Sequence, residues 1–531
     1  MLKTLQILLT QQNNPSLDLY QVIIPIIPIN PINPITPINA PTHKDHHQKR
    51  PNIMRKLLIT LLLVFTGMTA ITAQTRELHI LSVNDMHATL DNMPMLAAIA
   101  DSLRDIDKQT LIFSAGDNRT GDPVNDLYPI PTYPMTALMN LIGFDASALG
   151  NHEFDSAQKG LAKVVSTSNF PYLCANLKAD AEFRIQTEPY RIFVIDGIKI
   201  GVLGVVQLGT KGLPDAHPDL LHGLSFTPVE ETIRQYEWLR DKVDIYILLS
   251  HVGFEDDVVL AEKFPYFDLI IGGHTHTQLN GGELHNGVLV TQNENKLKLA
   301  TYITLKVVDG KLVEKSAKNI DVKGFGRKNE VAESMVKFFA SNPEFKRVLT
   351  TAEEFNNVEQ LGCLMCDAIK EMLGADIALQ NGGGVRLSKK EAGPFTVNDV
   401  LRLDPFNNQC VEMEVTGEEF KQMYISCFSN DSHDPPFVSG VRCELVADTL
   451  TRVAKDVRLF TPDGKKFNLK KKYRVVCNSY VAAICDSPRK DEGHGTGKRC
   501  SDLLIQYLDG HAPIDYRDVQ RVTVIHTQSK K

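Results

Sequence analysis

The stretch Leu149-Gly150-Asn151-His152-Glu153-Phe154-Asp155 decides the fold, because it places an amide, an imidazole and two carboxylates directly behind the apolar run 146–149. A buried strand that ends here would deliver these polar groups to the edge of a sheet. By itself the stretch is open to two interpretations. Gly150-Asn151 is compatible with a simple turn, and Asp155 with a cap of the helix that begins near Ser156. The rest of the chain decides whether the polar groups have partners.

Five apolar runs in the first half of the chain each end in a side chain that can bind a metal ion. These side chains are Asp85 and His87, Asp117, Asn151 and His152, His251, and His274 and His276. Asp85, Asp117 and Asn151 lie 32 and 34 residues apart, about the length of one strand-helix-strand unit. In open α/β sheets, ligands bind beyond the carboxyl ends of the strands. A turn-and-cap interpretation would have to apply independently at each of the five places.

The set combines carboxylates, imidazoles and an amide without a thiolate, which suits zinc, manganese, iron or cobalt. It holds more ligands than one ion with an open position needs, and enough for two. Two ions about 3.5–4 Å apart share a bridging ligand and lower the pKa of a bound water. Asp117, central in chain order and preceded by Gly116, is the expected bridge. The sequence therefore predicts two divalent metal ions of undetermined identity.

Several of these motifs together resemble the calcineurin-like metallophosphoesterases. The motifs are Asn84–His87, Gly116-Asp117, Gly150–Asp155, the region of His251, and Gly272–His276. Gly-Asn-His-Glu-Phe-Asp with Gly-Gly-His-Thr-His is similar to the secreted 5′-nucleotidase family in particular.

The resemblance implies a role for each of these residues. Asp85, His87 and His276 would bind one ion; Asn151, His251 and His274 would bind the other; Asp117 would bridge them. It also implies a catalytic pair. His152 would protonate a leaving oxygen or stabilise a transferring phosphoryl group, and Asp155 would orient it.

The second half resembles the 5′-nucleotidase C-terminal domain at three places. They are Asn381-Gly382-Gly383-Gly384-Val385-Arg386, Asp404–Asn408, and Asn478-Ser479-Tyr480 with Asp486. The resemblance implies that Arg386 binds substrate phosphate, that Phe406 and Tyr480 sandwich a nucleobase, and that Asp486 lies nearby. The alternatives are a plain glycine loop and ordinary core or turn aromatics.

Two departures from the family pattern leave the preferred substrate open. The family usually carries Gly-Gly-Asp-Gly after the second aromatic residue, whereas this chain has Ile484-Cys485-Asp486-Ser487-Pro488. Related enzymes often offer arginines in the segment that corresponds to 357–366, which contains none here.

The N-terminal part has a different composition. Residues 1–53 are rich in proline and are expected to be disordered or a mis-called extension. Met54-Arg55-Lys56, an apolar run at 57–65 and small residues thereafter indicate a signal peptide at 54–73. We expect an α/β metallophosphoesterase β-sandwich with flanking helices at 76–320, a linker helix at 321–349, and a smaller α+β substrate-binding domain at 350–528.

Composition sets further bounds. A net charge of -7 over 531 residues gives no reason to expect a nucleic acid polymer as partner. Eight of the nine cysteines lie between Cys363 and Cys500. The CxxC pair Cys363 and Cys366 lacks a second pair for zinc, so buried or disulfide-bonded thiols are expected.

The expected function is that of an exported dinuclear-metal phosphohydrolase that releases phosphate from nucleoside 5′-monophosphates. We expect it to be secreted, periplasmic or at the cell surface, without a stable membrane span after signal cleavage, and its oligomeric state is open. The rival enzymes are a nucleotide-sugar hydrolase and a 2′,3′-cyclic-nucleotide phosphodiesterase. A rival of another class is a non-catalytic surface binding protein on this scaffold.

Overall fold

The computed structural model describes residues 75–130, 132–431, 434–448, 453–509, 511 and 513–527, all within one compact unit, Ala73–Lys531. The expected extension at 1–53 and signal peptide at 54–73 lie outside the described residues.

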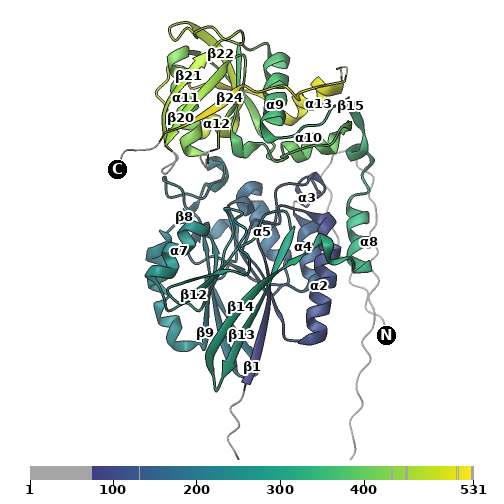
Figure 1. Ribbon diagram of the computed structural model, residues 1–531, viewed down its shortest axis with the longest axis vertical. Helices are drawn as coiled ribbons and strands as arrows, with labels where there is room; N and C mark the ends of the chain where they lie inside the picture. Colours follow the sequence, from purple (N-terminus) through teal and green to yellow (C-terminus); the bar gives the residue numbers. More distant parts are fainter. Residues whose placement is uncertain are drawn as a thin grey trace, which may run out of the picture. The chain divides into compact units, whose positions relative to one another are not determined.

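Two six-stranded sheets form the core of the first half of the described chain (Figure 1). The first contains, in spatial order, β14 (Lys311–Asp321), β13 (Leu299–Val308), β1 (Thr75–Val83), β2 (Leu111–Ser114), β3 (Ala146–Ala148) and β4 (Tyr172–Leu173). Strands β1 to β4 are parallel, with Val83 opposite Ser114 and Ser114 opposite Ser147. This register brings the segments that follow β1, β2 and β3 to one edge of the sheet.

The second sheet contributes two more strand ends to the site. It contains β11 (Glu283–His285), β12 (Val288–Thr291), β10 (Leu269–Ile271), β9 (Ile245–His251), β7 (Ile198–Val206) and β6 (Tyr190–Ile195). Strands β7, β9, β10 and β12 are parallel. Asp196-Gly197 within the apolar stretch 190–206 predicts a hairpin turn, and β6 and β7 turn there.

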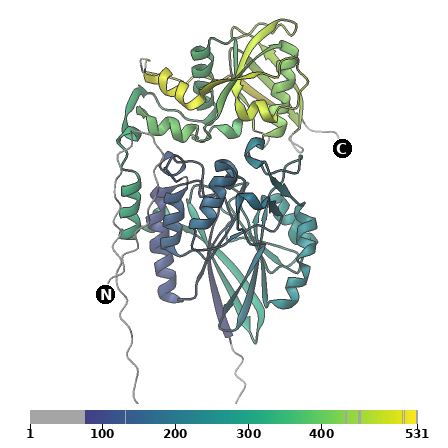
Figure 2. The same cartoon turned by 180° about the vertical axis from the view of Figure 1, so that it is seen from behind.

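Helices cover the outer faces of both sheets, as seen from the front and from behind (Figures 1 and 2). Apolar side chains of both sheets, such as Ile80, Phe113, Ile200, Ile247 and Ile303, fill the space between them. The first sheet packs against α2 (Met93–Ile106), α4 (Tyr133–Ile142) and α8 (Glu330–Phe339), and the second against α6 (Val229–Gln235) and α7 (Phe254–Lys263). The predicted β-sandwich with flanking helices is confirmed.

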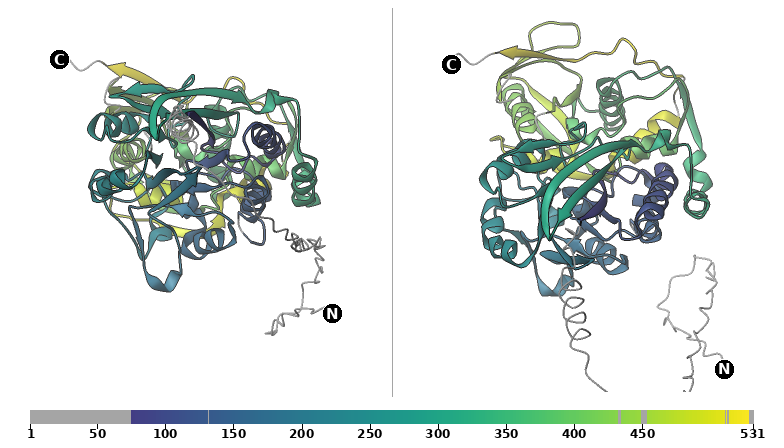
Figure 3. Two further views of the ribbon diagram at one scale, coloured as in Figure 1. Left: turned by 90° about the horizontal axis from the view of Figure 1, so that it is seen from below. Right: turned by 60° about the horizontal axis from the view of Figure 1, so that its bottom comes forward.

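Two details of this half differ from the sequence-based expectation. Strand β14 was not foreseen; it pairs with β13 in a long ribbon that curves along the sheet edge (Figure 3). Its side chains are mostly exposed or half-buried, so it lacks the apolar run used to recognise the other strands. The helical spacing of apolar residues predicts one helix over 229–239. The helix breaks at Tyr236 and continues as a short 3-10 helix, Glu237–Lys242.

Helix α5 (Ala157–Thr167) also packs against the first sheet through Leu161 and Val164. The shorter elements of this half are α3 (Pro123–Asp126) and the paired strands β5 (Leu177–Ala179) and β8 (Leu224–Phe226). Helix α8 lies in the expected linker region and packs Ala332, Val336 and Phe339 into the core that also contains α2 and α4.

The second half forms a smaller α+β domain. Its main sheet has the order β19 (Phe437–Ser439), β16 (Ile377–Gln380), β22 (Lys472–Asn478), β18 (Gln409–Thr416) and β23 (His494–Arg499). A three-stranded sheet contains β21 (Ala454–Phe460), β20 (Arg442–Asp448) and β24 (Val522–Thr527), and β15 (Val348–Ala352) pairs with β17 (Gly393–Thr396). The helices are α9 (Val358–Leu373), α10 (Val397–Leu403), α11 (Gly417–Asn430), α12 (Ser479–Ile484) and α13 (Cys500–Asp509).

All nine cysteines are buried, and none forms a disulfide bond. Cys363 and Cys366 lie on α9 within an apolar cluster, in agreement with the expectation of buried thiols. Among the described residues, no helix is both long and apolar enough to cross a membrane.

Asp257 in the first turn of α7 is a buried carboxyl group without a hydrogen-bond partner for either oxygen among the described residues. Burial raises its pKa from 3.8 to about 8. Between these two values the folded state keeps a proton that the unfolded state has lost. The free energy of unfolding therefore falls as pH rises, by about 1 kcal/mol per pH unit.

We expect the Asp257→Asn variant to lose this part of the pH dependence, measured by urea denaturation between about pH 5 and pH 7.5 under identical metal conditions. Glu255→Gln, an exposed change in the same helical turn, is the matched control and should keep the wild-type slope. An unchanged slope in Asp257→Asn contradicts the prediction.

Candidate functional site

The side chains expected to bind metal ions lie at the carboxyl ends of five strands. Asp85 and His87 follow β1, Asp117 follows β2, Asn151 follows β3, His251 ends β9, and His274 and His276 follow β10. Five of them have positive φ angles: Asp85 (48°), His87 (44°), Asp117 (52°), His274 (79°) and His276 (56°). Such a conformation costs about 1–3 kcal/mol per residue and persists only where the surroundings impose it. Backbone strain is thus concentrated where the polar groups converge.

The side chains form overlapping clusters whose ligand atoms lie within 4.8 Å of one another. One cluster contains Asp85, His87 and His276, a second contains Asp117, His251 and His274, and a third joins His87, Asp117 and His152. Nε2 of His276 is 3.3 Å from Oδ1 of Asp85, and Nε2 of His251 is 3.2 Å from Oδ2 of Asp117. The first cluster holds the three residues that the family resemblance assigns to one ion. The second holds the expected bridge Asp117 with two of the three residues assigned to the other ion, and the number of ions stays a prediction.

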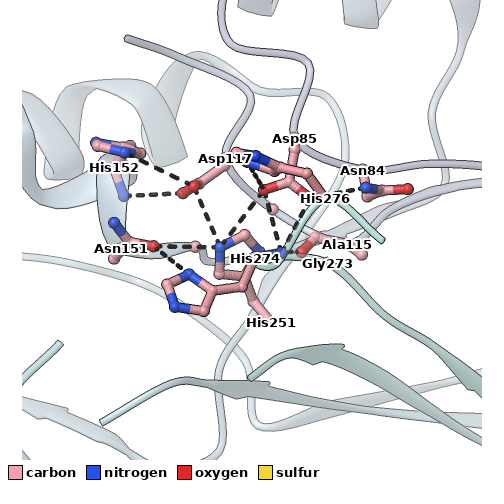
Figure 4. Close-up of polar contacts among 12 residues, drawn as sticks. Asn84, Asp85, Ala115, Asp117, Asn151, His152, His251, Gly273, His274 and His276 are labelled. Carbon is pink, nitrogen blue, oxygen red and sulfur yellow. Dashed lines mark hydrogen bonds and ion pairs between the residues drawn. The ribbon is translucent and has the colours of Figure 1, made fainter. Parts of the chain in front are cut away.

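The amide of Asn151 is oriented toward the second cluster (Figure 4). Its Nδ2 donates to the carbonyl oxygen of Asp215 at 2.9 Å. Oδ1 therefore faces Nε2 of His251 at 3.3 Å and Nδ1 of His274 at 3.0 Å. Asp215, on a loop that the sequence did not single out, fixes which end of the amide is available to a metal ion.

Backbone carbonyl groups fix the orientation of two imidazoles. The carbonyl oxygen of Ala115 lies 2.6 Å from Nδ1 of His251, and that of Thr120 lies 3.0 Å from Nδ1 of His87. A proton on Nδ1 leaves the Nε2 lone pair free in both rings. Metal-binding histidines are held in this way by partners behind the ring.

The charge of the cluster fits divalent cations. Asp85 is 0% and Asp117 2% exposed, and buried carboxylates are costly unless they are paired with positive charge. Burial lowers the pKa of His251, but Asp117 and Asp85 outweigh it and raise the value to about 10. A bound metal ion requires the neutral imidazole and would displace that proton. The carboxylate, imidazole and amide donors are those that borderline divalent metals accept.

Glu153 organises the backbone beneath the cluster. It is 1% exposed, and its carboxylate accepts hydrogen bonds from the backbone amides of Asp117 at 2.9 Å, Asn118 at 2.9 Å and Gly150 at 2.7 Å. Glu153 has no role among the sequence-based expectations. Its position three residues after Gly150 matches the capping-box spacing and was the available signal.

The sequence favours two explanations for this segment, and both are wrong in detail. One is that Gly150 lets the backbone turn sharply, and the other is that an extended segment points Asn151 and His152 in opposite directions. Gly150 has an ordinary φ of -97°, so it is not needed for a sharp turn; a Cβ there would lie 2.2 Å from Oδ1 of Asp117. Asn151–Ser156 is a 3-10 helix, not an extended segment. Asn151 and His152 diverge because successive residues of such a helix are rotated by about 120°.

His152 and Asp155 form a hydrogen-bonded pair. Nδ1 of His152 is 2.8 Å from Oδ2 of Asp155, and its Nε2 is 4.0 Å from Oδ2 of Asp117. Burial lowers the pKa of His152, but Asp117 and Asp155 outweigh it, so the net pKa is raised. The N-cap residue of α5 is Ser156, not Asp155, and its side chain makes no capping hydrogen bond to the helix. The arrangement therefore favours the pair over the helix-cap interpretation of Asp155.

The residues expected to bind substrate divide into two groups. Nη2 of Arg386 lies 3.2 Å from both ring nitrogens of His87, and the Phe406 ring centroid is 5.7 Å from that of His152. These two residues lie beside the cluster.

Tyr480 and Asp486 contact other loops of the first half. The Tyr480 ring is 6.4 Å from His217, and Asp486 pairs with Lys211 at 2.9 Å. Within the described part of the chain, no ring contact joins Phe406 to Tyr480.

Comparison with known proteins agrees with this geometry. Residues 78–278 match the family model of the calcineurin-like phosphoesterases, and residues 335–487 match that of the 5′-nucleotidase C-terminal domain. The chain is 30% identical to a 5′-nucleotidase of Vibrio cholerae over 520 residues, which covers 83% of this chain and 92% of that protein. It is 28% identical to protein UshA of Yersinia enterocolitica, covering 84% of this chain and 93% of that one.

A solved structure shows the same fold. The crystal structure of a 5′-nucleotidase precursor from Thermus thermophilus superposes with a TM-score of 0.74 at 24% identity, covering 85% of this chain and 99% of the other. The resemblance noted in the sequence is thereby confirmed over both halves. The chain belongs to the 5′-nucleotidase family of calcineurin-like phosphoesterases and is a metal-dependent phosphoester hydrolase.

Proposed function

We propose that the protein is an exported hydrolase that releases phosphate from nucleoside 5′-monophosphates with two divalent metal ions. The observation that carries the proposal is the position of Arg386 and Phe406 beside the ligand cluster and His152. A guanidinium group matches phosphate oxygens and an aromatic face matches a nucleobase. The name of the Vibrio cholerae relative, a 5′-nucleotidase, points to the same substrate class.

The metal ligands are assigned in two groups. Asp85, His87 and His276 would hold one ion; Asn151, His251 and His274 would hold the other; Asp117 would bridge them. When bound, the ions polarise the phosphoryl group and lower the pKa of a coordinated water. The identity of the metals is left to analysis of the purified protein.

His152 would supply proton chemistry next to the metal ions. Its Nδ1 is bonded to Asp155, so Nε2 is the ring atom that can face the substrate. Since the pKa of His152 is raised by Asp117 and Asp155 against burial, the ring can hold a proton there. That proton would be given to the leaving oxygen or shared with the transferring phosphoryl group.

The remaining proposals concern chain organisation and substrate placement. Residues 54–73 would direct export to the periplasm, the cell surface or the medium. Residues 76–320 would carry the metal site, 321–349 would link, and 350–528 would bind the nucleoside through Phe406, Tyr480 and Asp486.

Removal of metal ions should lower the thermal stability of the protein, because the buried carboxylates then lose their counter-charge. Metal restored at about 100 times its dissociation constant should add about 2.7 kcal/mol of stability. We expect the Asp117→Asn variant to lose most of this gain in thermal melts with and without chelator. Asp196→Asn, a change at the exposed β6–β7 turn, is the control, and an equal gain in both variants contradicts the ligand assignment.

Replacement of His152 by alanine should lower kcat for AMP by about 10²–10⁴-fold, the contribution of a positioned acid or base. Metal content, measured by elemental analysis, should stay at the wild-type level because His152 is not among the assigned ligands. A variant that retains full kcat would refute the role of His152.

The substrate class is tested with metal-supplemented wild-type protein on AMP, a nucleotide sugar and 2′,3′-cyclic AMP. Release of inorganic phosphate should be fastest from AMP. A higher kcat/KM for either of the other two substrates would replace the proposed activity by that of the corresponding rival enzyme. No turnover of the three substrates with any of manganese, zinc, cobalt or iron would contradict the proposed nucleotide hydrolase.

A further inference from the structure

Thr120, in the loop after β2, contacts both the metal-ligand cluster and the catalytic pair. It is 1% exposed. Its hydroxyl group donates to Oδ2 of Asp155 at 2.6 Å, and its carbonyl oxygen lies 3.0 Å from Nδ1 of His87. One residue therefore touches the partner of His152 with its side chain and an assigned metal ligand with its backbone.

The backbone of Thr120 is strained. Its φ is 67°, a left-handed conformation that is unfavourable for a β-branched residue. Next to it, a Cβ on Gly121 would lie 2.6 Å from the carbonyl oxygen of His87, so the loop runs very close to β1's end. Strain of this kind persists only where other contacts hold it and is concentrated at functional sites.

The carboxylate of Asp126 holds this loop in place. It accepts hydrogen bonds from three successive backbone amides, those of Thr120 at 3.1 Å, Gly121 at 2.8 Å and Asp122 at 3.1 Å. The carboxylate is in turn bonded by Nδ2 of Asn125 at 3.0 Å. The threonine hydroxyl is thus presented to Asp155 from a fixed backbone.

Both hydrogen bonds to Asp155 meet at the same oxygen. Oδ2 accepts from the Thr120 hydroxyl at 2.6 Å and contacts Nδ1 of His152 at 2.8 Å. A carboxylate rotates easily about its terminal bond, and a second donor removes that freedom. Burial raises the pKa of Asp155, but His152, the buried Arg119 and the Thr120 hydroxyl group outweigh it and lower the value. The Asp155 carboxyl group is therefore ionised and accepts both hydrogen bonds.

We propose that Thr120 is a positioning residue for the hydrolysis: its hydroxyl group fixes the Asp155 carboxylate, which in turn fixes the His152 ring. This inference rests on the proposed function, since it acts through His152. The competing explanation is that the hydroxyl group only stabilises the loop.

The test is a double-mutant cycle of Thr120→Val with His152→Ala, with kcat and KM measured on AMP. Valine keeps the shape and the β-branch but removes the donor. Thr120→Val alone should lower kcat about 10–100-fold, the usual effect of losing a partner behind a functional group, with KM changed less than threefold. In the His152→Ala background the same change should have no further effect on kcat.

Two control variants separate positioning from stability. Thr120→Ser keeps the donor and should restore kcat to within about threefold of wild type. Thr232→Val removes an equally buried hydroxyl group, which donates to the carbonyl oxygen of Pro228 at 3.0 Å in the same half of the chain. It should leave kcat unchanged even if it lowers the melting temperature.

The outcomes also distinguish this inference from the proposed function. If wild type does not hydrolyse AMP, the proposed function fails. If His152→Ala is impaired while Thr120→Val has wild-type kcat, only the inference fails. Thr120→Val effects that are additive with His152→Ala, or that follow a loss of bound metal, overturn the inference in favour of a structural role.

Discussion

The burial of two carboxylates at the meeting point of two sheets is the constraint on which the rest of the site depends. Asp85 and Asp117 are almost inaccessible to water, and buried anions are tolerated only with positive charge or hydrogen-bond donors around them. Oδ1 of Asp117 accepts a hydrogen bond from the backbone amide of His152 at 2.8 Å, and Oδ2 lies 3.2 Å from Nε2 of His251. Strand ends from both sheets are needed to supply these partners.

This constraint also accounts for the strained backbone of the loops. To bring their side chains inward within one or two residues of a strand end, Asp85, His87 and Asp117 adopt left-handed conformations. The conformational free energy that these residues cost is offset by two carboxylates, each of which accepts hydrogen bonds from several backbone amides. Glu153 does so for the loops after β2 and β3, and Asp126 does so for the loop at Thr120. The site is therefore held by acidic residues that are not themselves among the expected metal ligands.

The sequence predicts the strands and the positions of the expected ligands because both follow from local patterns, whereas the β-sandwich is what the family resemblance implies. Apolar runs that end in a polar residue mark strand ends, and parallel strands bring their carboxyl ends to one edge. What the sequence could not show depends on the approach of loops far apart in the chain. Position 150 requires glycine because a Cβ there would clash with the Asp117 side chain. The proposed role of Thr120 depends on its hydrogen bond to Asp155, 35 residues away. Strand β14 could not be predicted from the sequence because its side chains are mostly exposed and it therefore has no apolar run.

Arg386 shows why the proposed substrate would complete the site. Its guanidinium group lies 3.2 Å from both ring nitrogens of His87. The Nε2 lone pair that could accept from the guanidinium group is the one that a bound metal ion would use. Burial lowers the pKa of Arg386, whereas the site carboxylates Asp117, Asp155 and Asp85 oppose that change. Bound metal ions would neutralise Asp117 and Asp85 and leave the arginine with less compensating negative charge. A phosphate anion supplies the missing charge, so metal binding and phosphate binding should reinforce one another at this site.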